Sequence, residues 1–135
     1  MLLLRGDLAD GALAATLGQR GAAVDDLVVY RTAEAPSASR GLLGRALRAG
    51  PVDAVVFSSG STVRGLVALA REDGVDIVHV PAICFGEPTA AVARAAGFDV
   101  LAISIDPDPT SVALTTMRSL RDREPTPRPE LQEIR

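Results

Sequence analysis

The sequence predicts an α/β protein: a doubly wound, flavodoxin-like sheet of five parallel strands with helices on both faces. Three observations lead to this class. Strand-like and helix-like segments alternate along the 135 residues. Successive strand patterns are separated by about 30 residues, the length of a βα unit. The apolar run over residues 54–58 has no polar alternation, as a parallel strand buried on both faces requires.

Apolar spacing defines each element in turn. Leu13 and Leu17 have the spacing of one helix face, and Gly21 is a natural end for that helix. Gly50 and Pro51 end the second helix. The predicted order is strand 2–5, helix 8–20, strand 24–31, helix 36–49, strand 54–58, helix 61–71, strand 78–85, helix 88–96, strand 100–105 and helix 109–120.

Three helix starts carry residues suited to that position. Ser61 is the predicted N-cap of the third helix, because a serine hydroxyl accepts from a backbone N–H of the first turn. Pro88 and Pro109 suit the first helical position, where a missing N–H costs nothing. These elements make residues 1–122 a single α/β domain. The proline-containing, polar residues 123–135 are predicted to form a tail.

Composition excludes several classes of function. Aromatic residues are only 3% of the chain and there is no Trp, so the core is predicted to consist of Ala, Val and Leu. The formal net charge of −3 argues against nucleic acid, which requires a clustered basic face. One cysteine, Cys84, and one histidine, His79, exclude a disulfide framework and the usual zinc sites. With no long apolar run and no signal peptide, a cytoplasmic protein without a membrane partner is expected.

Two strand-to-helix junctions form the candidate site, one over residues 55–64 (VVFSSGSTVR) and one from residue 86 to 94 (GEPTAAVAR). In an open parallel sheet, ligands bind beyond the carboxyl ends of the strands. Helix N-termini at that edge offer free N–H groups and partial positive charge. The junctions therefore predict a site for a carboxylate or phosphate group, without a metal.

Each of these features also has a purely structural explanation. A Ser or Thr at a helix start usually serves only as a cap. The ring of Tyr30 could simply pack with its hydroxyl in water. Cys84 lies within an apolar strand pattern and is expected to be an inert core residue. Neither a GxGxxG nor a GxxxxGK[ST] phosphate motif is present in the sequence.

The order of the junction motifs resembles the second half of the uroporphyrinogen-III synthase family. Residues 57–64 (FSSGSTVR) are similar to the family's Ser-Ser-Pro-Ser loop, with Gly60 in the place of the proline. Residues 86–90 (GEPTA) are similar to its Gly-Pro-Thr-Thr-Ala loop. Upstream, residues 3–6 (LLRG) and 29–32 (VYRT) resemble the segment in which the family's chain crosses between two domains.

The resemblance implies a lyase without a cofactor, which cyclises hydroxymethylbilane to uroporphyrinogen III with loss of water and inversion of ring D. It implies that Tyr30 is catalytic and assists the departing hydroxyl. It further implies that substrate carboxylates meet the two loops, through Ser59, Ser61, Thr62, Gly86 and Thr89. Glu87 departs from the family pattern, and its charge would repel such a substrate.

Members of the family are roughly twice as long and have two domains, joined here by the expected crossing segment 29–35. The chain is therefore expected to be a fragment, the last part of a fusion with a uroporphyrinogen-III C-methyltransferase, or a natural half. The missing N-terminal half or an exchanged homodimer would complete it. A non-catalytic anion- or tetrapyrrole-binding or regulatory module remains the alternative, and the end product (haem, sirohaem or cobalamin) stays open.

Overall fold

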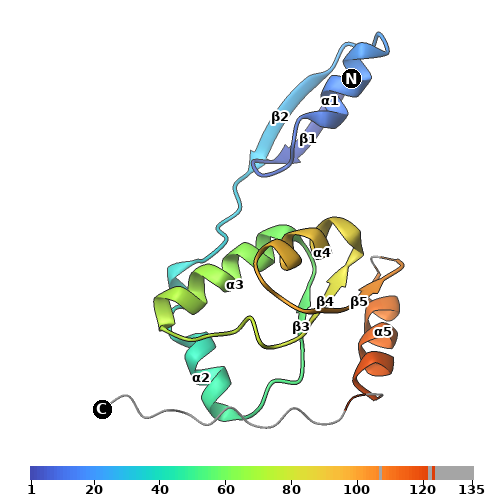
Figure 1. The fold of residues 1–135 in the computed structure, drawn as a ribbon. Helices are drawn as coiled ribbons and strands as arrows, with labels where there is room; N and C mark the ends of the chain where they lie inside the picture. Colours follow the sequence, from blue (N-terminus) through green and yellow to red (C-terminus); the bar gives the residue numbers. More distant parts are fainter. Residues whose placement is uncertain (107, 122, 124–135) are drawn as a thin grey trace. The chain divides into compact units, whose positions relative to one another are not determined.

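A computed structural model describes residues 1–106, 108–121 and 123, and the chain divides into two compact units, Met1–Ala33 and Glu34–Arg135 (Figure 1). The predicted alternation of strands and helices is present in both units. The first unit contains β1 (Leu2–Gly6), α1 (Ala12–Gln19) and β2 (Asp25–Tyr30). The second contains a 3-10 turn (Ser37–Ser39), α2 (Leu42–Ala49), β3 (Val55–Phe57), α3 (Gly60–Asp73), β4 (Ala82–Phe85), α4 (Gly86–Ala95), β5 (Val100–Ser104) and α5 (Pro109–Arg121).

The strands form two parallel sheets, so the prediction of one five-stranded sheet is wrong. β1 pairs with β2, and β3, β4 and β5 form a separate sheet in that order. The parallel α/β class is confirmed. The error arises because apolar periodicity identifies a strand but not its hydrogen-bonding partner. The single domain over residues 1–122 stays a prediction, and the predicted tail, 123–135, lies outside the described residues except Arg123.

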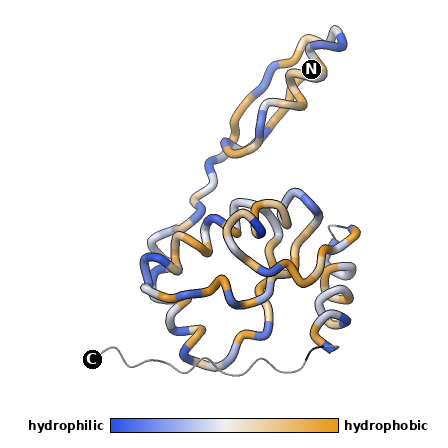
Figure 2. The backbone as a smooth tube through the Cα atoms, in the orientation of Figure 1, coloured by the Kyte–Doolittle hydropathy of each residue, from blue (hydrophilic) through white to orange (hydrophobic). Residues whose placement is uncertain are grey.

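The first unit leaves much of its apolar surface exposed. Its two strands are parallel and pair from Leu2 opposite Asp25 to Gly6 opposite Tyr30, with a register shift between Arg5 and Gly6. A cross-strand ion pair joins Arg5 to Asp26 at 2.8 Å, and the Asp26 carboxylate raises the pKa of Arg5. Figure 2 shows hydrophobic residues along both strands. The exposed apolar side chains of this unit include Leu2, Leu4, Leu8, Leu13, Leu27, Val28 and Val29.

The second unit has a compact core between its sheet and its helices. The rings of Phe57 and Phe98 meet edge to face at its centre, with centroids 5.1 Å apart. Other core residues are Val63, Ala70, Ile77, Val80, Ala82, Cys84, Ala90 and Ala93. The predicted alanines and valines are present, but of the leucines of this unit Leu43, Leu47 and Leu66 are only partly buried against the core, and Leu42 and Leu114 are exposed. Two phenylalanines supply the bulk instead, because one large ring fills space that alanines leave open.

The predicted second helix, 36–49, is shorter than expected because the chain turns at Gly41. This glycine has φ = 70°, a left-handed conformation, and the α-helix begins after it. The carboxylate of Asp73, the last residue of α3, accepts from the N–H groups of Gly41 and Gly44, both at 3.0 Å. Asp73 therefore caps the start of α2 from a neighbouring helix. No described helix is long and apolar enough to cross a membrane.

Candidate functional site

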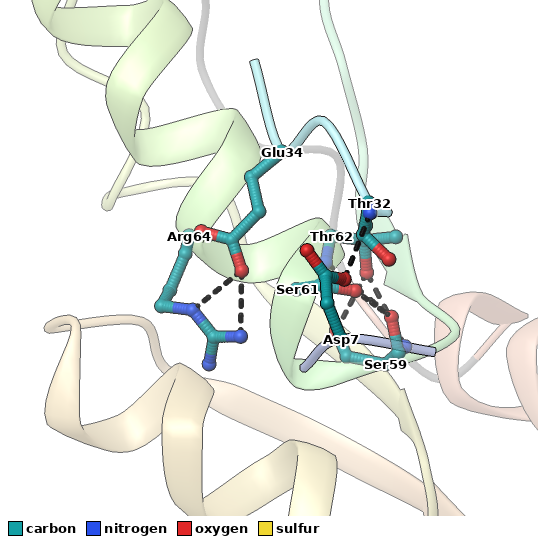
Figure 3. A network of polar contacts seen from close by, with 7 residues as sticks. All are labelled: Asp7, Thr32, Glu34, Ser59, Ser61, Thr62 and Arg64. Atoms are coloured by element: carbon teal, nitrogen blue, oxygen red, sulfur yellow. Dashed lines mark hydrogen bonds and ion pairs between the residues drawn. The ribbon is translucent and has the colours of Figure 1, made fainter. Parts of the chain in front are cut away.

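The loop after β3 brings three of the predicted binding residues together at the start of α3 (Figure 3). The Ser59 hydroxyl accepts from the Thr62 N–H at 3.4 Å, and the Thr62 hydroxyl accepts from the Ser59 N–H at 3.3 Å. This reciprocal capping box makes Ser59 the N-cap, so the prediction that Ser61 is the cap is wrong. The hydroxyls of Ser59 and Ser61 lie 2.8 Å apart, forming a pair of polar groups beside the helix N-terminus.

The junction at which β4 runs directly into α4 lies at the same edge of the sheet. Phe57 pairs with Cys84 near the ends of β3 and β4. The chain therefore leaves the sheet at neighbouring positions after these two strands. A Cβ on Gly60 would lie 3.1 Å from a methyl carbon of Val92, which shows how closely the start of α3 approaches α4. The two predicted binding loops are therefore neighbours in this unit.

Gly86 opens α4 in a left-handed conformation, with φ = 79°, that favours glycine. Because the helix starts here, Pro88 is its third residue and not its first, which corrects the prediction. Thr89 is 5% exposed and packs inward. No described side chain caps the first turn of α4, so the N–H groups at its start, those of Gly86 and Glu87, have no side-chain acceptor.

The carboxylate of Glu87 is paired with an arginine and does not cap the N-terminus of α4. Its carboxylate forms an ion pair with Arg94, one of the last residues of α4, at 2.5 Å. The pairing directs the carboxylate along the helix, which reduces the repulsion that the sequence predicted at this position. An anion at the start of α4 would therefore meet backbone dipoles before it meets a free negative charge.

The helix start after β5 is already occupied by the chain itself. The Asp108 carboxylate accepts from the N–H groups of Thr110 and Ser111, at 2.9 and 3.1 Å. Ser104, at the end of β5, shares a hydrogen bond of 2.9 Å with the Ser111 hydroxyl. Pro109 is the first residue of α5, as predicted. Of the three helix N-termini at this edge, those of α3 and α5 are capped by Ser59 and Asp108, and that of α4 has no side-chain cap.

Tyr30, the predicted catalytic residue, belongs to the first unit and ends β2. Its side chain is 62% exposed, and its ring lies over Gly6. The Asp7 N–H donates to the Tyr30 carbonyl at 3.1 Å, and the Asp7 carboxylate accepts from the Thr32 N–H at 2.9 Å (Figure 3). Sequence reasoning missed this role of Asp7, although the pairing of adjacent strand ends was a signal for it.

Arg64 and Glu34 form a second polar contact that the sequence did not indicate. The guanidinium of Arg64 holds the Glu34 carboxylate, with Nε at 2.8 Å and Nη2 at 2.6 Å (Figure 3). The Glu34 carboxylate raises the pKa of Arg64. Thirty residues separate the two partners along the chain, so no local spacing could have predicted the pair.

Cys84 is completely buried in β4, and burial raises the pKa of its thiol. The protonated thiol is a poor nucleophile, which agrees with the expected core role. Among the described residues no cluster of His, Cys, Asp or Glu could hold a metal ion. Hydroxyl groups and backbone N–H groups lie at this edge, and such donors are suited to a carboxylate.

Comparisons with known proteins show what this chain is similar to. Residues 1–114 match the family model described as uroporphyrinogen-III synthase HemD. No curated protein matches the chain. Among solved structures, the chain is similar to the uroporphyrinogen III synthase of the extremely thermophilic bacterium Thermus thermophilus, with 23% identity and a TM-score of 0.49. The alignment covers 82% of this chain and 44% of that one, so the chain spans less than half the length of that protein.

Proposed function

The chain belongs to the uroporphyrinogen-III synthase family, and from this premise we propose that it forms part of an enzyme that closes hydroxymethylbilane into uroporphyrinogen III. In this reaction the hydroxyl of ring A leaves as water and ring D is inverted as the macrocycle closes. The family match over residues 1–114 is the observation that carries the proposal. The neighbouring hydroxyl-bearing helix starts of α3 and α4 agree with it.

The substrate is a polycarboxylate, and the starts of α3 and α4 suit its side chains. One carboxylate would lie beside Ser59, Ser61 and Thr62. There, one hydroxyl of the Ser59–Ser61 pair and the N–H groups of Gly60 and Ser61 can donate, while the Thr62 N–H is held by the cap. A second would lie against the backbone at the start of α4, at Gly86 and Glu87, and the buried Thr89 would support this turn from inside. Arg64 and Arg94 are engaged with Glu34 and Glu87, so binding relies on backbone dipoles and hydroxyls.

Tyr30 is the residue we assign to the chemical step. A departing hydroxyl needs a proton or a strong hydrogen bond, and a phenol held at a strand end can supply it. Its 62% exposure keeps it accessible to a substrate. No cofactor is assigned, because loss of water and ring closure involve no net oxidation or reduction, and the protein has to assist only the proton transfers.

The chain requires further strands to form a complete enzyme. The first unit has only two strands, and a two-stranded sheet is marginally stable alone. Its apolar side chains remain exposed, Leu2, Leu4, Leu27 and Val29 among them. We propose that they are covered by the N-terminal half of a synthase, or by a second copy of this chain through exchange. The chain alone is then weakly active or inactive.

The proposal is tested by measuring which isomer of uroporphyrinogen is formed. Closure of hydroxymethylbilane without inversion gives the symmetrical isomer, so the fraction of isomer III measures enzyme activity above the spontaneous background. We expect isomer III when the chain is supplied with the N-terminal half of a family member, and little without it. Only the symmetrical isomer in the reconstituted mixture, with carboxylate binding retained, would indicate a non-catalytic binding module instead.

A further inference from the structure

We infer that Asp7, together with Gly6, is a positioning residue for Tyr30. Both lie where β1 ends, beside the end of β2. The effect of this positioning on catalysis rests on the proposed function, since it matters only if the phenol of Tyr30 acts on a substrate. The contacts themselves are independent of that function.

Asp7 holds the backbone on both sides of Arg31. Its N–H donates to the Tyr30 carbonyl oxygen at 3.1 Å. Its carboxylate Oδ1 accepts from the Thr32 N–H at 2.9 Å (Figure 3). One residue thereby fixes two peptide groups that flank a single residue of the chain. The direction in which Tyr30 leaves the strand is set by these two bonds.

Gly6 provides the place in which the ring lies. Gly6 and Tyr30 are partners in the strand register. A Cβ at residue 6 would lie 2.6 Å from Cζ, 2.7 Å from Cε2 and 2.8 Å from the hydroxyl oxygen of Tyr30. Any side chain there would displace the ring. Only the bare Cα of glycine allows the phenol to lie back across the end of β1.

These contacts restrict an exposed tyrosine side chain that would otherwise be mobile. Tyr30 is 62% exposed, and an exposed side chain samples several rotamers. A catalytic group must instead stay within a fraction of an ångström of its productive position. Holding the backbone through Asp7 and supporting the ring on Gly6 restrict Tyr30 without burying it. The hydroxyl then stays accessible to a substrate.

The orientation of Tyr30 can be followed directly by fluorescence, because of the composition of the chain. Tyr30 is the single tyrosine and there is no tryptophan, so intrinsic fluorescence reports on this one ring. Asp7→Ala removes the carboxylate that accepts from the Thr32 N–H, whereas Asp7→Asn keeps an oxygen acceptor in its place. Asp10→Ala is the matched control, because it also removes an aspartate of this unit that accepts a backbone N–H, that of Ala12 at 3.3 Å.

We expect Asp7→Ala to lower the fluorescence anisotropy of Tyr30 in the full chain, while Asp7→Asn and Asp10→Ala keep the wild-type value. An unchanged anisotropy in Asp7→Ala would overturn the inference. If Asp7→Ala fails to fold, Gly6→Ala decides the matter, because it leaves both Asp7 bonds in place and displaces the ring. Gly6→Ala with wild-type anisotropy would then overturn it.

Turnover in the reconstituted two-domain enzyme is the second readout. We expect Asp7→Ala to lower kcat by about 10- to 100-fold with little change in KM, and Asp7→Asn to restore it. A change of anisotropy without any change of kcat would leave Asp7 as a residue that orders Tyr30, and would remove the catalytic meaning. Failure of the inference and failure of the proposed function are thus distinguished.

Discussion

The carbonyl group of Glu34 lies directly against Gly65, in the middle of α3. A Cβ at residue 65 would be 2.9 Å from the Glu34 carbonyl carbon and closer still to its oxygen. The neighbouring residue, Arg64, holds the Glu34 carboxylate at 2.6 Å. Backbone and side chain of the first residue of the second unit are therefore fixed to one turn of one helix.

Gly65→Ala is expected to destabilise the second unit by about 1–3 kcal/mol, because the clash is with backbone and not with a movable side chain. Alanine is the better helix former by about 1 kcal/mol, so any net loss of stability is due to the clash. The measurement is thermal or urea unfolding followed by circular dichroism. Gly18→Ala in α1, where a Cβ meets nothing within 4 Å, is the control and should not destabilise.

Ser59→Ala and Ser61→Ala should separate capping from binding. Ser59 is the N-cap of α3, so its loss is expected to cost about 1 kcal/mol of unfolding free energy. Ser61→Ala removes a hydroxyl 2.8 Å from that of Ser59 but leaves the capping box, and stability should be nearly unchanged. Both variants should bind a tricarboxylate such as citrate more weakly by calorimetry. Equal losses of stability in the two variants would contradict this assignment.

Glu87→Gln should strengthen anion binding at the start of α4. The carboxylate is in the first turn and pairs with Arg94, so replacing it removes a nearby negative charge and frees the guanidinium. The expected gain in citrate affinity is about two- to fivefold at low salt and smaller at high salt. Arg94→Ala should have the opposite effect, since it leaves the Glu87 charge without its partner. Binding that is indifferent to both changes would place the anion away from α4.

Asp73 should make the second unit sensitive to acid. The N–H groups of Gly44 and Gly41 hold the pKa of its carboxyl below the ordinary value of 3.8. A depressed pKa means that the contribution to stability is complete above the unfolded-state value and is lost as the pH falls through the folded-state value. The melting temperature of Asp73→Asn should therefore lie below that of the wild type at neutral pH, because the amide keeps one acceptor oxygen instead of two. That difference should narrow below about pH 4. A gap that stays constant throughout the acid range would contradict this role.

Tyr30→Phe in the reconstituted two-domain enzyme should lower kcat by about 10²–10⁴-fold if the phenol acts as a general acid. The melting temperature should stay nearly unchanged, because the ring and its support on Gly6 are retained. Production of isomer III is the assay. Unaltered turnover would leave Tyr30 as a residue that only ends β2.

Local sequence pattern was sufficient to predict the helices and strands and the polar residues that follow β3 and β4. Alternating apolar segments predicted each strand and helix, and the structure has them in that order, with Pro109 opening the last helix. Small and hydroxyl residues after β3 predicted the polar start of α3, although Ser59 and not Ser61 is its cap. Caps and helix faces depend on residues within a few positions of one another, so sequence reasoning reaches them.

The sequence by itself determined the α/β class, the order of the elements and the family resemblance carried by its loops. Tertiary structure alone decided that the strands divide into two sheets, that Asp7 binds Thr32 across 25 positions, and that Arg64 pairs with Glu34 across 30. Strand partners and ion pairs between distant residues depend on which surfaces meet once the chain has folded. Apolar periodicity along the chain does not specify those long-range contacts.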